Sequence, residues 1–276
     1  MSAPLHAVAL AATGRWAGSG AAPTVVLLHP GPALDGSVFL PGAERLRERG
    51  AGLLLLDLPG SGQSPDPVGP DAWTLRGHAR AIADAIAAAG IADPVVLGHS
   101  FGGYVAAQLL VDGLPARGWI LSCTDVDEQP PPEAPEDPLA GLPPAVAARF
   151  TAAEEREATV ADGPGCRAIW EDELPVLCHD VAAGLRMLER VAWRPAPFHD
   201  RDWGELDALG ALAATAAPVL AIGGEHDRVT PPACARRIAA TAPRGTLALL
   251  DSGHFPFVEA AAAYWDAVAG WLERLG

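Results

Sequence analysis

The sequence predicts an α/β protein: a mostly parallel sheet with helices on both faces, interrupted by a helical insertion. Short apolar runs that stop at Gly, Asp or His alternate with helical segments, which is typical of parallel sheets. Residues 125–205 break this alternation and contain no clean strand pattern. The chain has 276 residues, enough for one large domain that carries an insertion.

Six apolar runs have the composition of strands that are buried on both faces of a sheet. We expect strands over residues 25–29, 53–57, 95–99, 119–123, 219–223 and 246–251. We expect core helices over residues 44–49, 75–89, 104–111, 232–241 and 257–275. Residues 1–24 are expected to add one or two antiparallel edge strands.

The insertion opens with the proline-rich, acidic stretch "DVDEQPPPEAPEDP", which does not suit a sheet. Helical patterns follow over residues 145–157, 167–173 and 181–191. A structureless loop of this length would be unusual in a compact domain, so we interpret the region as a helical cap. The predicted division is a first core part over residues 1–124, the cap over 125–205 and a second core part over 206–276. The cap contains 18 acidic residues and 7 arginines, so most of the chain's net charge of −15 lies there.

The charge and composition exclude several classes of function. A strongly acidic chain does not suit nucleic acid, because binding phosphates requires a basic surface. All 19 basic residues are arginine, which excludes a phosphate-loop lysine and any lysine Schiff base. The four cysteines are widely spaced, so we expect reduced thiols in a cytoplasmic protein and no metal site. No signal peptide or membrane-spanning segment is predicted.

The sequence "VVLGHSFGGYVAA" carries the most specific motif in the chain. Residues 98–102 fit G-x-S-x-G, placed between an apolar strand run and a helical run, as this motif requires. A sharp strand-to-helix turn strains the serine backbone and leaves no room for side chains at Gly98 and Gly102. We therefore predict that Ser100 is a nucleophile at a helix N-terminus, where backbone amides favour negative charge.

A serine hydroxyl needs a base to remove its proton and an acid residue to orient that base. "DSGHFPFVE" places His254 in a loop after the last predicted strand, and "AIGGEHDRVTPP" places Asp227 after the strand before it. The order Ser100, Asp227, His254 is that of one known class of serine hydrolase. We predict these three residues as the catalytic set, with Asp125 as an alternative acid.

The loop "LLHPGPALDG" follows the strand predicted over residues 25–29 and is expected to help bind the developing oxyanion. One amide donor should belong to Phe101, directly after the nucleophile. Pro30 and Pro32 have no N–H group, so the second donor should belong to Gly31 or a later residue such as Ala33.

Taken together, "HPGP", "DLPGSGQS", "GHSFGG", "GEHDRVTPP" and "GHFPFVE" resemble the α/β-hydrolase superfamily over nearly the whole chain outside the insertion. The resemblance implies an eight-stranded, mostly parallel sheet and a helical cap inserted after strand six. Serine at position 100 distinguishes the chain from the branches of the superfamily that use aspartate there, the haloalkane dehalogenases and epoxide hydrolases.

Within that superfamily, "CRAIWEDE" is similar to a cap-helix motif of proline iminopeptidases. The resemblance implies that Glu171 binds the free α-amine of the substrate. If the chain is such a peptidase, we expect Trp170 to pack on an apolar ring of the substrate. The alternative is that Glu171, Asp172 and Glu173 form a solvated run of charges.

Three hypotheses about function follow. The first is an aminopeptidase or amidase that releases an N-terminal proline-like residue. The second is an esterase, thioesterase or lactonase acting on a small apolar acyl compound. The third is a ligand-binding protein on the same scaffold, because a fold does not dictate function. The expected partner is a small molecule or short peptide, and no cofactor is implied.

Overall fold

A computed structural model describes residues 4–275, except residues 19, 41, 70, 128–130, 132, 135–136 and 200–205. The described residues form a seven-stranded sheet in the order β1-β3-β2-β4-β5-β6-β7. The edge strand β1 pairs antiparallel with β3, and the other five pairings are parallel. The strands are Ala7–Leu10, Thr24–Leu28, Gly52–Leu56, Val95–His99, Gly118–Ser122, Val219–Gly224 and Gly245–Leu250 (β1 to β7).

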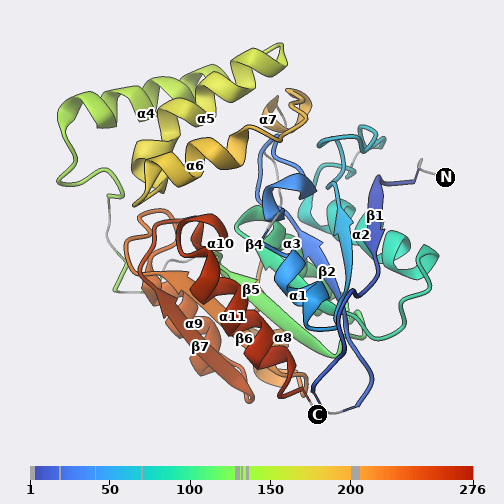
Figure 1. Cartoon of the computed structure of the whole chain (residues 1–276). Coiled ribbons are helices and arrows are strands. Elements are labelled where there is room, and N and C mark those ends of the chain that lie inside the picture. The colour runs from blue at the N-terminus through green and yellow to red at the C-terminus, as the bar shows by residue number, and fades with distance from the viewer. Residues whose placement is uncertain are drawn as a thin grey trace.

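The predicted sheet of eight strands is corrected to seven among the described residues. The N-terminal region contributes one antiparallel strand, β1 (Figure 1). The chain that follows β1 bonds to a helix end instead of pairing as a second strand, because the amides of Thr13 and Gly14 donate to the carbonyl of Arg47. The six strands predicted from apolar runs lie within one residue of the observed bounds of β2 to β7.

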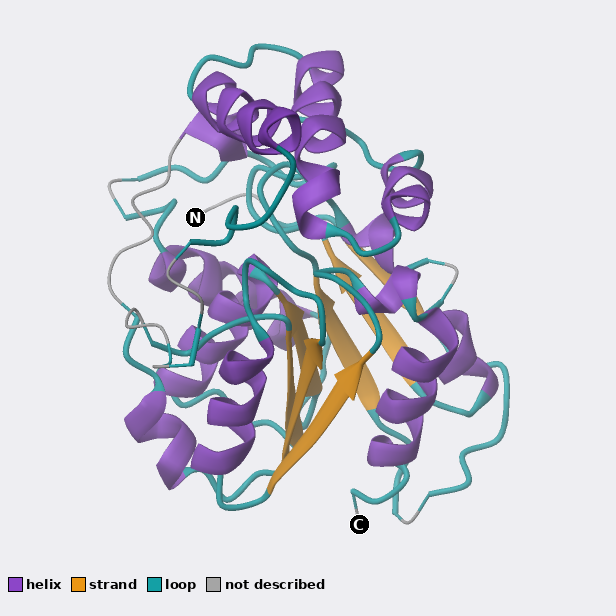
Figure 2. Cartoon of the chain, turned by 90° about the vertical axis from the view of Figure 1, so that its left-hand side faces the viewer, coloured by secondary structure: helices purple, strands orange, loops and turns teal. Residues whose placement is uncertain are grey.

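Helices cover both faces of the sheet, as Figure 2 shows. Side chains alternate along each strand: Val25 and Leu27 pack with one core cluster, and Val26 and Leu28 with the other. The first cluster includes residues of α1 (Glu44–Glu48) and α11 (Ala261–Leu272). The second includes residues of α2 (Leu75–Ala88), α3 (Phe101–Val111), α8 (Leu209–Ala214) and α9 (Pro232–Thr241). Two short helices complete the core, η1 (Gly36–Phe39) and α10 (Pro256–Glu259).

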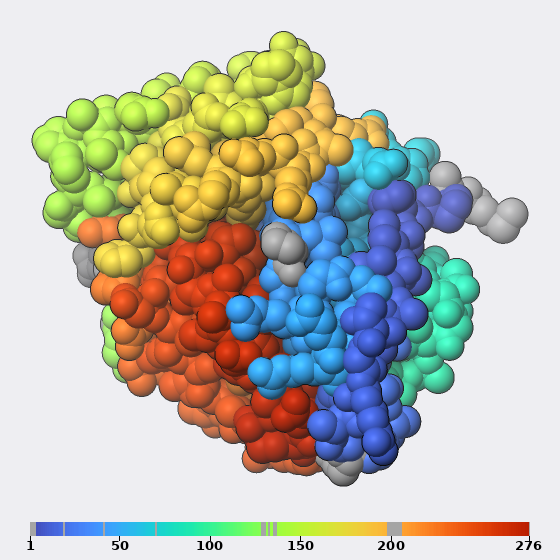
Figure 3. All heavy atoms as spheres, viewed as in Figure 1, coloured from blue at the N-terminus to red at the C-terminus, as the bar shows by residue number. Residues whose placement is uncertain are grey.

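The segment between β5 and β6 rises over the end of the sheet as a layer of helices (Figure 1), and in the space-filling view its yellow-green to yellow atoms lie on top of the core (Figure 3). Its helices are α4 (Pro144–Glu157), α5 (Gly163–Leu177), α6 (Val181–Leu188) and α7 (Ala196–His199). An isolated antiparallel bridge between Asp127 and Asp207 brings the two ends of this segment together. We keep the name cap for the described residues of the predicted insertion over 125–205. Buried cap side chains such as Trp170 and Met187 belong to the same cluster as the α1–α11 face of the core.

Two further properties bear on the class of protein. All four cysteines are free and buried. Among the described residues, the helices are too short or too polar to cross a membrane.

Candidate active site

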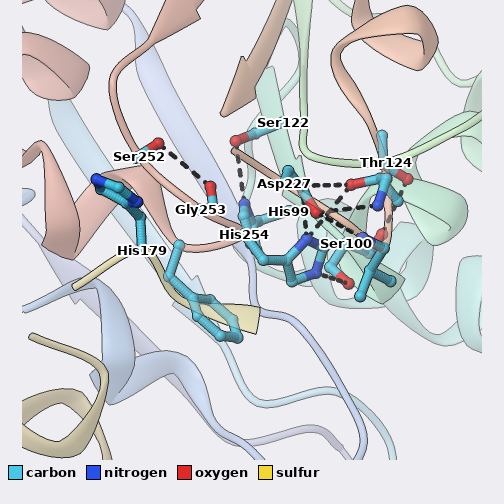
Figure 4. Close-up of polar contacts among 12 residues, drawn as sticks. His99, Ser100, Ser122, Thr124, His179, Asp227, Ser252, Gly253 and His254 are labelled. Atoms are coloured by element: carbon cyan, nitrogen blue, oxygen red, sulfur yellow. Dashed lines mark hydrogen bonds and ion pairs between the residues drawn. The ribbon is translucent and has the colours of Figure 1, made fainter. Parts of the chain in front are cut away.

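Three predicted side chains meet at the carboxyl ends of parallel strands, beneath the cap. Ser100 follows β4, Asp227 follows β6 and His254 follows β7. Nε2 of His254 lies 2.9 Å from Oγ of Ser100, although 154 residues separate them. Nδ1 of the same ring lies 2.8 Å from Oδ2 of Asp227. The three residues therefore form a continuous hydrogen-bonded chain (Figure 4).

Ser100 has a strained backbone conformation, with φ of 51° and ψ of −119°. Glycines on either side make this turn possible. A Cβ on Gly98 would lie 2.2 Å from the carbonyl oxygen of Gly102, and a Cβ on Gly102 would lie 2.2 Å from that of Leu28. The turn presents the Ser100 hydroxyl at the start of α3, as the motif predicts.

Asp227 is held as an anion by four donors. Oδ1 accepts from the amides of Val229 and Thr230 at 2.9 and 3.0 Å, and Oδ2 accepts from the Thr230 hydroxyl at 2.7 Å. His254 supplies the fourth. Burial alone would raise the pKa of Asp227, but the interaction with His254 and the hydrogen bonds from Thr230 outweigh it, so its pKa lies below the usual range.

The alternative acid, Asp125, has different partners. It is buried, and its Oδ1 bonds to the guanidinium of Arg237 and to the amide of Val126. No hydrogen bond between Asp125 and His254 occurs among the described residues. The geometry therefore favours Asp227 over Asp125 as the partner of the imidazole.

The loop that carries His254 is fixed to the cap by Glu259, a residue that sequence reasoning did not single out. Its carboxylate accepts hydrogen bonds from the amides of Gly253 and Phe255 on both sides of His254, at 3.1 and 2.9 Å. It also accepts from the amides of His179 and Asp180 in the cap, at 2.7 and 2.8 Å. One carboxylate therefore joins the loop that carries His254 to the turn between α5 and α6, which we call the cap corner.

Gly253 shows how closely these segments approach. A Cβ at this position would lie 2.5 Å from the carbonyl oxygen of Leu177 and 2.6 Å from the amide nitrogen of His179. The amide of His254 donates to the same Leu177 carbonyl at 2.7 Å. Figure 4 shows His179 beside the segment that carries Gly253 and His254.

The two predicted oxyanion donors lie next to each other. A Cβ on Gly31 would be 3.1 Å from the ring of Phe101, so the two residues are in contact across 70 positions of sequence. Both line a pocket that also contains Pro32, Trp73 and, from the cap, Pro197. Ala33, the other donor considered, is fully buried and is not among the residues that line the pocket.

Three histidines around the site are buried. Burial lowers the pKa of His29, His78 and His99, in the case of His78 to about 4. His29 accepts from the amide of Leu58 through Nε2, and Nδ1 of His99 lies 3.0 Å from the Ser122 hydroxyl. His29 and His78 both line the pocket, whereas the ring of His99 lies beside that of His254, with centroids 5.3 Å apart.

The sequence "CRAIWEDE" lies in the middle of α5, and its side chains point in different directions. Trp170 faces the core: its Nε1 donates to the carbonyl of Pro32 at 3.1 Å, and its ring packs against Phe255. Glu171 points outward and forms an ion pair with Arg167 at 2.7 Å. The structure therefore brings Trp170 to the loop of Gly31, while Glu171 is held by a neighbouring turn of its own helix.

The remaining two carboxylates correct the interpretation of a uniformly solvated run. Asp172 forms ion pairs with Arg149 and Arg156 of α4, and hydrogen bonds from these arginines lower its pKa. Glu173 is buried, with 6% of its surface exposed. A helix turns 100° per residue, so consecutive side chains point in different directions. Glu171 therefore faces solvent, Asp172 faces the neighbouring helix α4, and Glu173 is buried.

The fold and the hydrogen-bonded chain define the class of protein: a hydrolase-type α/β fold with an inserted cap. The sequence matches the model of the Alpha/beta hydrolase family over residues 25–267, and the chain belongs to this family.

Similar proteins cover nearly the whole chain. A relative from Rhodobacter capsulatus, named the magnesium-chelatase 30 kDa subunit, is 28% identical over 91% of this chain and 87% of its own length. An esterase from Thermogutta terrifontis is 23% identical, covers 98% of this chain and 93% of its own, and superposes with a TM-score of 0.73. A proline iminopeptidase from Mycobacterium smegmatis is 22% identical, covers 98% and 94%, and has a TM-score of 0.74. These solved structures share the fold.

Proposed function

We propose that the chain is a serine hydrolase in which Ser100, His254 and Asp227 form the catalytic triad. The observation that carries the proposal is the chain of two hydrogen bonds, 2.9 Å from Ser100 to His254 and 2.8 Å from His254 to Asp227. The strained backbone of Ser100 is a second support, because strain of this kind persists where the surrounding structure imposes it.

The proposed reaction has two halves. Oγ of Ser100 attacks the substrate carbonyl carbon while Nε2 of His254 takes the hydroxyl proton. The ionised carboxylate of Asp227 stabilises the imidazolium that results. The carbonyl oxygen becomes an anion, which the amides of Gly31 and Phe101 bind in our proposal. His254 then protonates the leaving group, and water releases the acyl group from Ser100 by the same steps.

We infer an ester or lactone of a small acyl compound as the preferred substrate class. The pocket beside Gly31 and Phe101 is lined largely by rings and prolines, including Pro59, Trp73 and Pro197. Such a lining suits an apolar group, which gains free energy by leaving water. The esterase from Thermogutta terrifontis, which has the same fold, is consistent with this class.

A second candidate is an aminopeptidase that accepts an N-terminal proline-like residue. It is supported by the similarity in fold to the iminopeptidase from Mycobacterium smegmatis. Trp170 adds no support, because it is buried in the core cluster and is not among the residues that line the pocket. Against it, the Glu171 carboxylate already pairs with Arg167, and its side chain is 41% exposed. A substrate amine would have to displace the guanidinium of Arg167, so Glu171 would discriminate only weakly in favour of substrates with a free amine.

A third candidate, a role without hydrolysis, is favoured by the name of the Rhodobacter capsulatus relative, which describes a chelatase subunit. An intact hydrogen-bonded chain at Ser100 weighs against a purely structural role. Labelling of Ser100 by a serine-directed phosphonate, detected by intact mass, separates the two: the hydrolase proposal requires labelling in the unmodified chain and none in Ser100→Ala.

A paired assay then separates esterase from aminopeptidase. p-Nitrophenyl acyl esters and prolyl arylamides are compared on the unmodified chain, Ser100→Ala and Glu171→Gln. We expect ester turnover that is lost in Ser100→Ala and changes less than about twofold in Glu171→Gln, because Glu171 lies outside the triad. Arylamide turnover that falls at least tenfold in Glu171→Gln would instead establish the aminopeptidase.

A further inference from the structure

A cluster of metal-ligating side chains lies outside the site described above. His179, His226 and Asp251 each offer one ligand atom, and these atoms lie within 4.8 Å of one another. The two imidazole rings stack with centroids 4.1 Å apart and an angle of 16° between their planes. Nε2 of His226 lies 2.9 Å from Oδ1 of Asp251. All three residues are exposed to solvent.

The three residues come from separate parts of the chain. His179 lies at the cap corner between α5 and α6, His226 in the loop after β6, and Asp251 at the end of β7. Their backbones are fixed: the amide of His179 donates to Glu259, and the amide of His226 donates to the carbonyl of Ser252 at 3.0 Å. Fixed backbones with exposed side chains allow the rings to rotate toward a shared ion.

The donor atoms suit zinc. Two imidazole nitrogens and one carboxylate oxygen are a common set of three protein ligands, with water in a fourth, tetrahedral position. Metal–ligand bonds of about 2.0 to 2.1 Å place tetrahedral ligands roughly 3.3 Å apart. The His226 and Asp251 atoms, 2.9 Å apart, are already close to this spacing. The other ligand atoms, within 4.8 Å, need to close by at most about 1.5 Å, which side-chain rotation at exposed positions allows.

We propose that His179, His226 and Asp251 form a zinc site that joins the cap corner to the two loops carrying Asp227 and His254. His226 directly precedes Asp227 in the chain, and Asp251 lies three residues before His254. Glu259 already links the cap to the core, and zinc at this position would provide a second link. The site contains none of the triad and stands independently of the proposed hydrolase activity.

A second group of possible ligands, Cys123, Asp227 and His254, also lies within 4.8 Å. These side chains are buried, and Asp227 and His254 already bond to each other. A metal there would have to break the hydrogen bond that holds the imidazole. Only the buried cluster contains a sulfur ligand, Cys123, so the two clusters differ in the chemistry of their ligands.

Isothermal titration of the full chain with Zn²⁺ tests the site. We expect one equivalent to bind, and His179→Ala and Asp251→Asn each to weaken binding at least about tenfold, as the loss of a ligand requires. Asp180→Asn is the matched control: Asp180 is an exposed neighbour outside the cluster, and asparagine can still cap α6. It should bind zinc as the unmodified chain does.

Two further measurements make the result decisive. Zn²⁺ should raise the melting temperature of the unmodified chain and of Ser100→Ala equally, but not that of His179→Ala. The electronic spectrum of the Co²⁺ complex should lack a thiolate-to-metal charge-transfer band. The proposal is overturned if one equivalent of zinc does not bind, if His179→Ala and Asp251→Asn bind it unchanged, or if the thiolate band appears.

Discussion

Nε1 of Trp170, in the cap, donates a hydrogen bond to the carbonyl oxygen of Pro32, 138 residues away in the core. Pro32 directly follows Gly31, whose amide we propose as an oxyanion donor. The cap helix α5 therefore holds the backbone of the loop that our mechanism requires to be rigid. Part of the proposed catalytic geometry thus depends on the cap.

Trp170→Phe should lower kcat/KM for p-nitrophenyl esters about fivefold, because the ring packing is kept and one hydrogen bond of about 1 kcal/mol is lost. Steady-state kinetics measures the change. Trp16→Phe is the control, since the buried Nε1 of Trp16 has no hydrogen-bond partner among the described residues, so the same substitution removes none of the described bonds there. Equal losses in both variants would contradict the role assigned to Trp170.

Local sequence signals predicted most of the fold, because strand ends and sharp turns are encoded by neighbouring residues. The predicted strand over residues 95–99 matches β4 in full, and the glycines of the motif around Ser100 are required by contacts shorter than 3 Å. The position of each candidate triad residue followed from where its strand ends. The roles of these residues remain proposals that the kinetic experiments address.

Features that depend on tertiary packing were not predictable. The four amides that Glu259 binds come from two segments about 75 residues apart in sequence, and no local pattern connects them. The burial of Glu173 depends on how α5 lies against the core, which periodicity within a helix does not determine. The eighth strand, which the resemblance and the upper estimate for residues 1–24 both allowed, does not form among the described residues, because the chain after β1 bonds to the carbonyl of Arg47.

Glu259→Gln should destabilise the chain by about 2 kcal/mol. An amide oxygen is a weaker acceptor than a carboxylate, and the amide NH₂ group would face backbone donors. Urea denaturation measures the loss. Glu273→Gln is the matched control, because Glu273 forms a surface ion pair with Arg49 at 3.6 Å and should contribute less than about 1 kcal/mol. A loss in Glu259→Gln no larger than that of the control would contradict its function as a link.

Asp227→Asn should lower kcat by about 10⁴, as loss of the acid in such a triad does, because asparagine cannot stabilise the imidazolium. Asp125→Asn tests the alternative acid and should leave kcat within about threefold, since Asp125 bonds to Arg237 rather than to His254. Both variants are measured under conditions where circular dichroism shows them folded. A larger loss in Asp125→Asn than in Asp227→Asn would reverse the assignment.

Acid should destabilise the folded chain through His78, whose pKa burial lowers from 6.5 to about 4. The unfolded chain binds a proton on this ring near pH 6.5, whereas the folded chain does not until about pH 4. The unfolded state therefore binds more protons over this interval, and stability falls as the pH falls from 6.5 toward 4.

His78 alone should account for about 2 kcal/mol of the stability lost between pH 7.5 and pH 5. His78→Gln removes the titrating group, so its loss over the same interval should be smaller by that amount. His6→Gln serves as the control, because His6 lies near the surface and packs beside Gln63. Denaturant titrations at the two pH values give both differences. If His78→Gln and the unmodified chain lose equal stability, the ring is not kept neutral by burial.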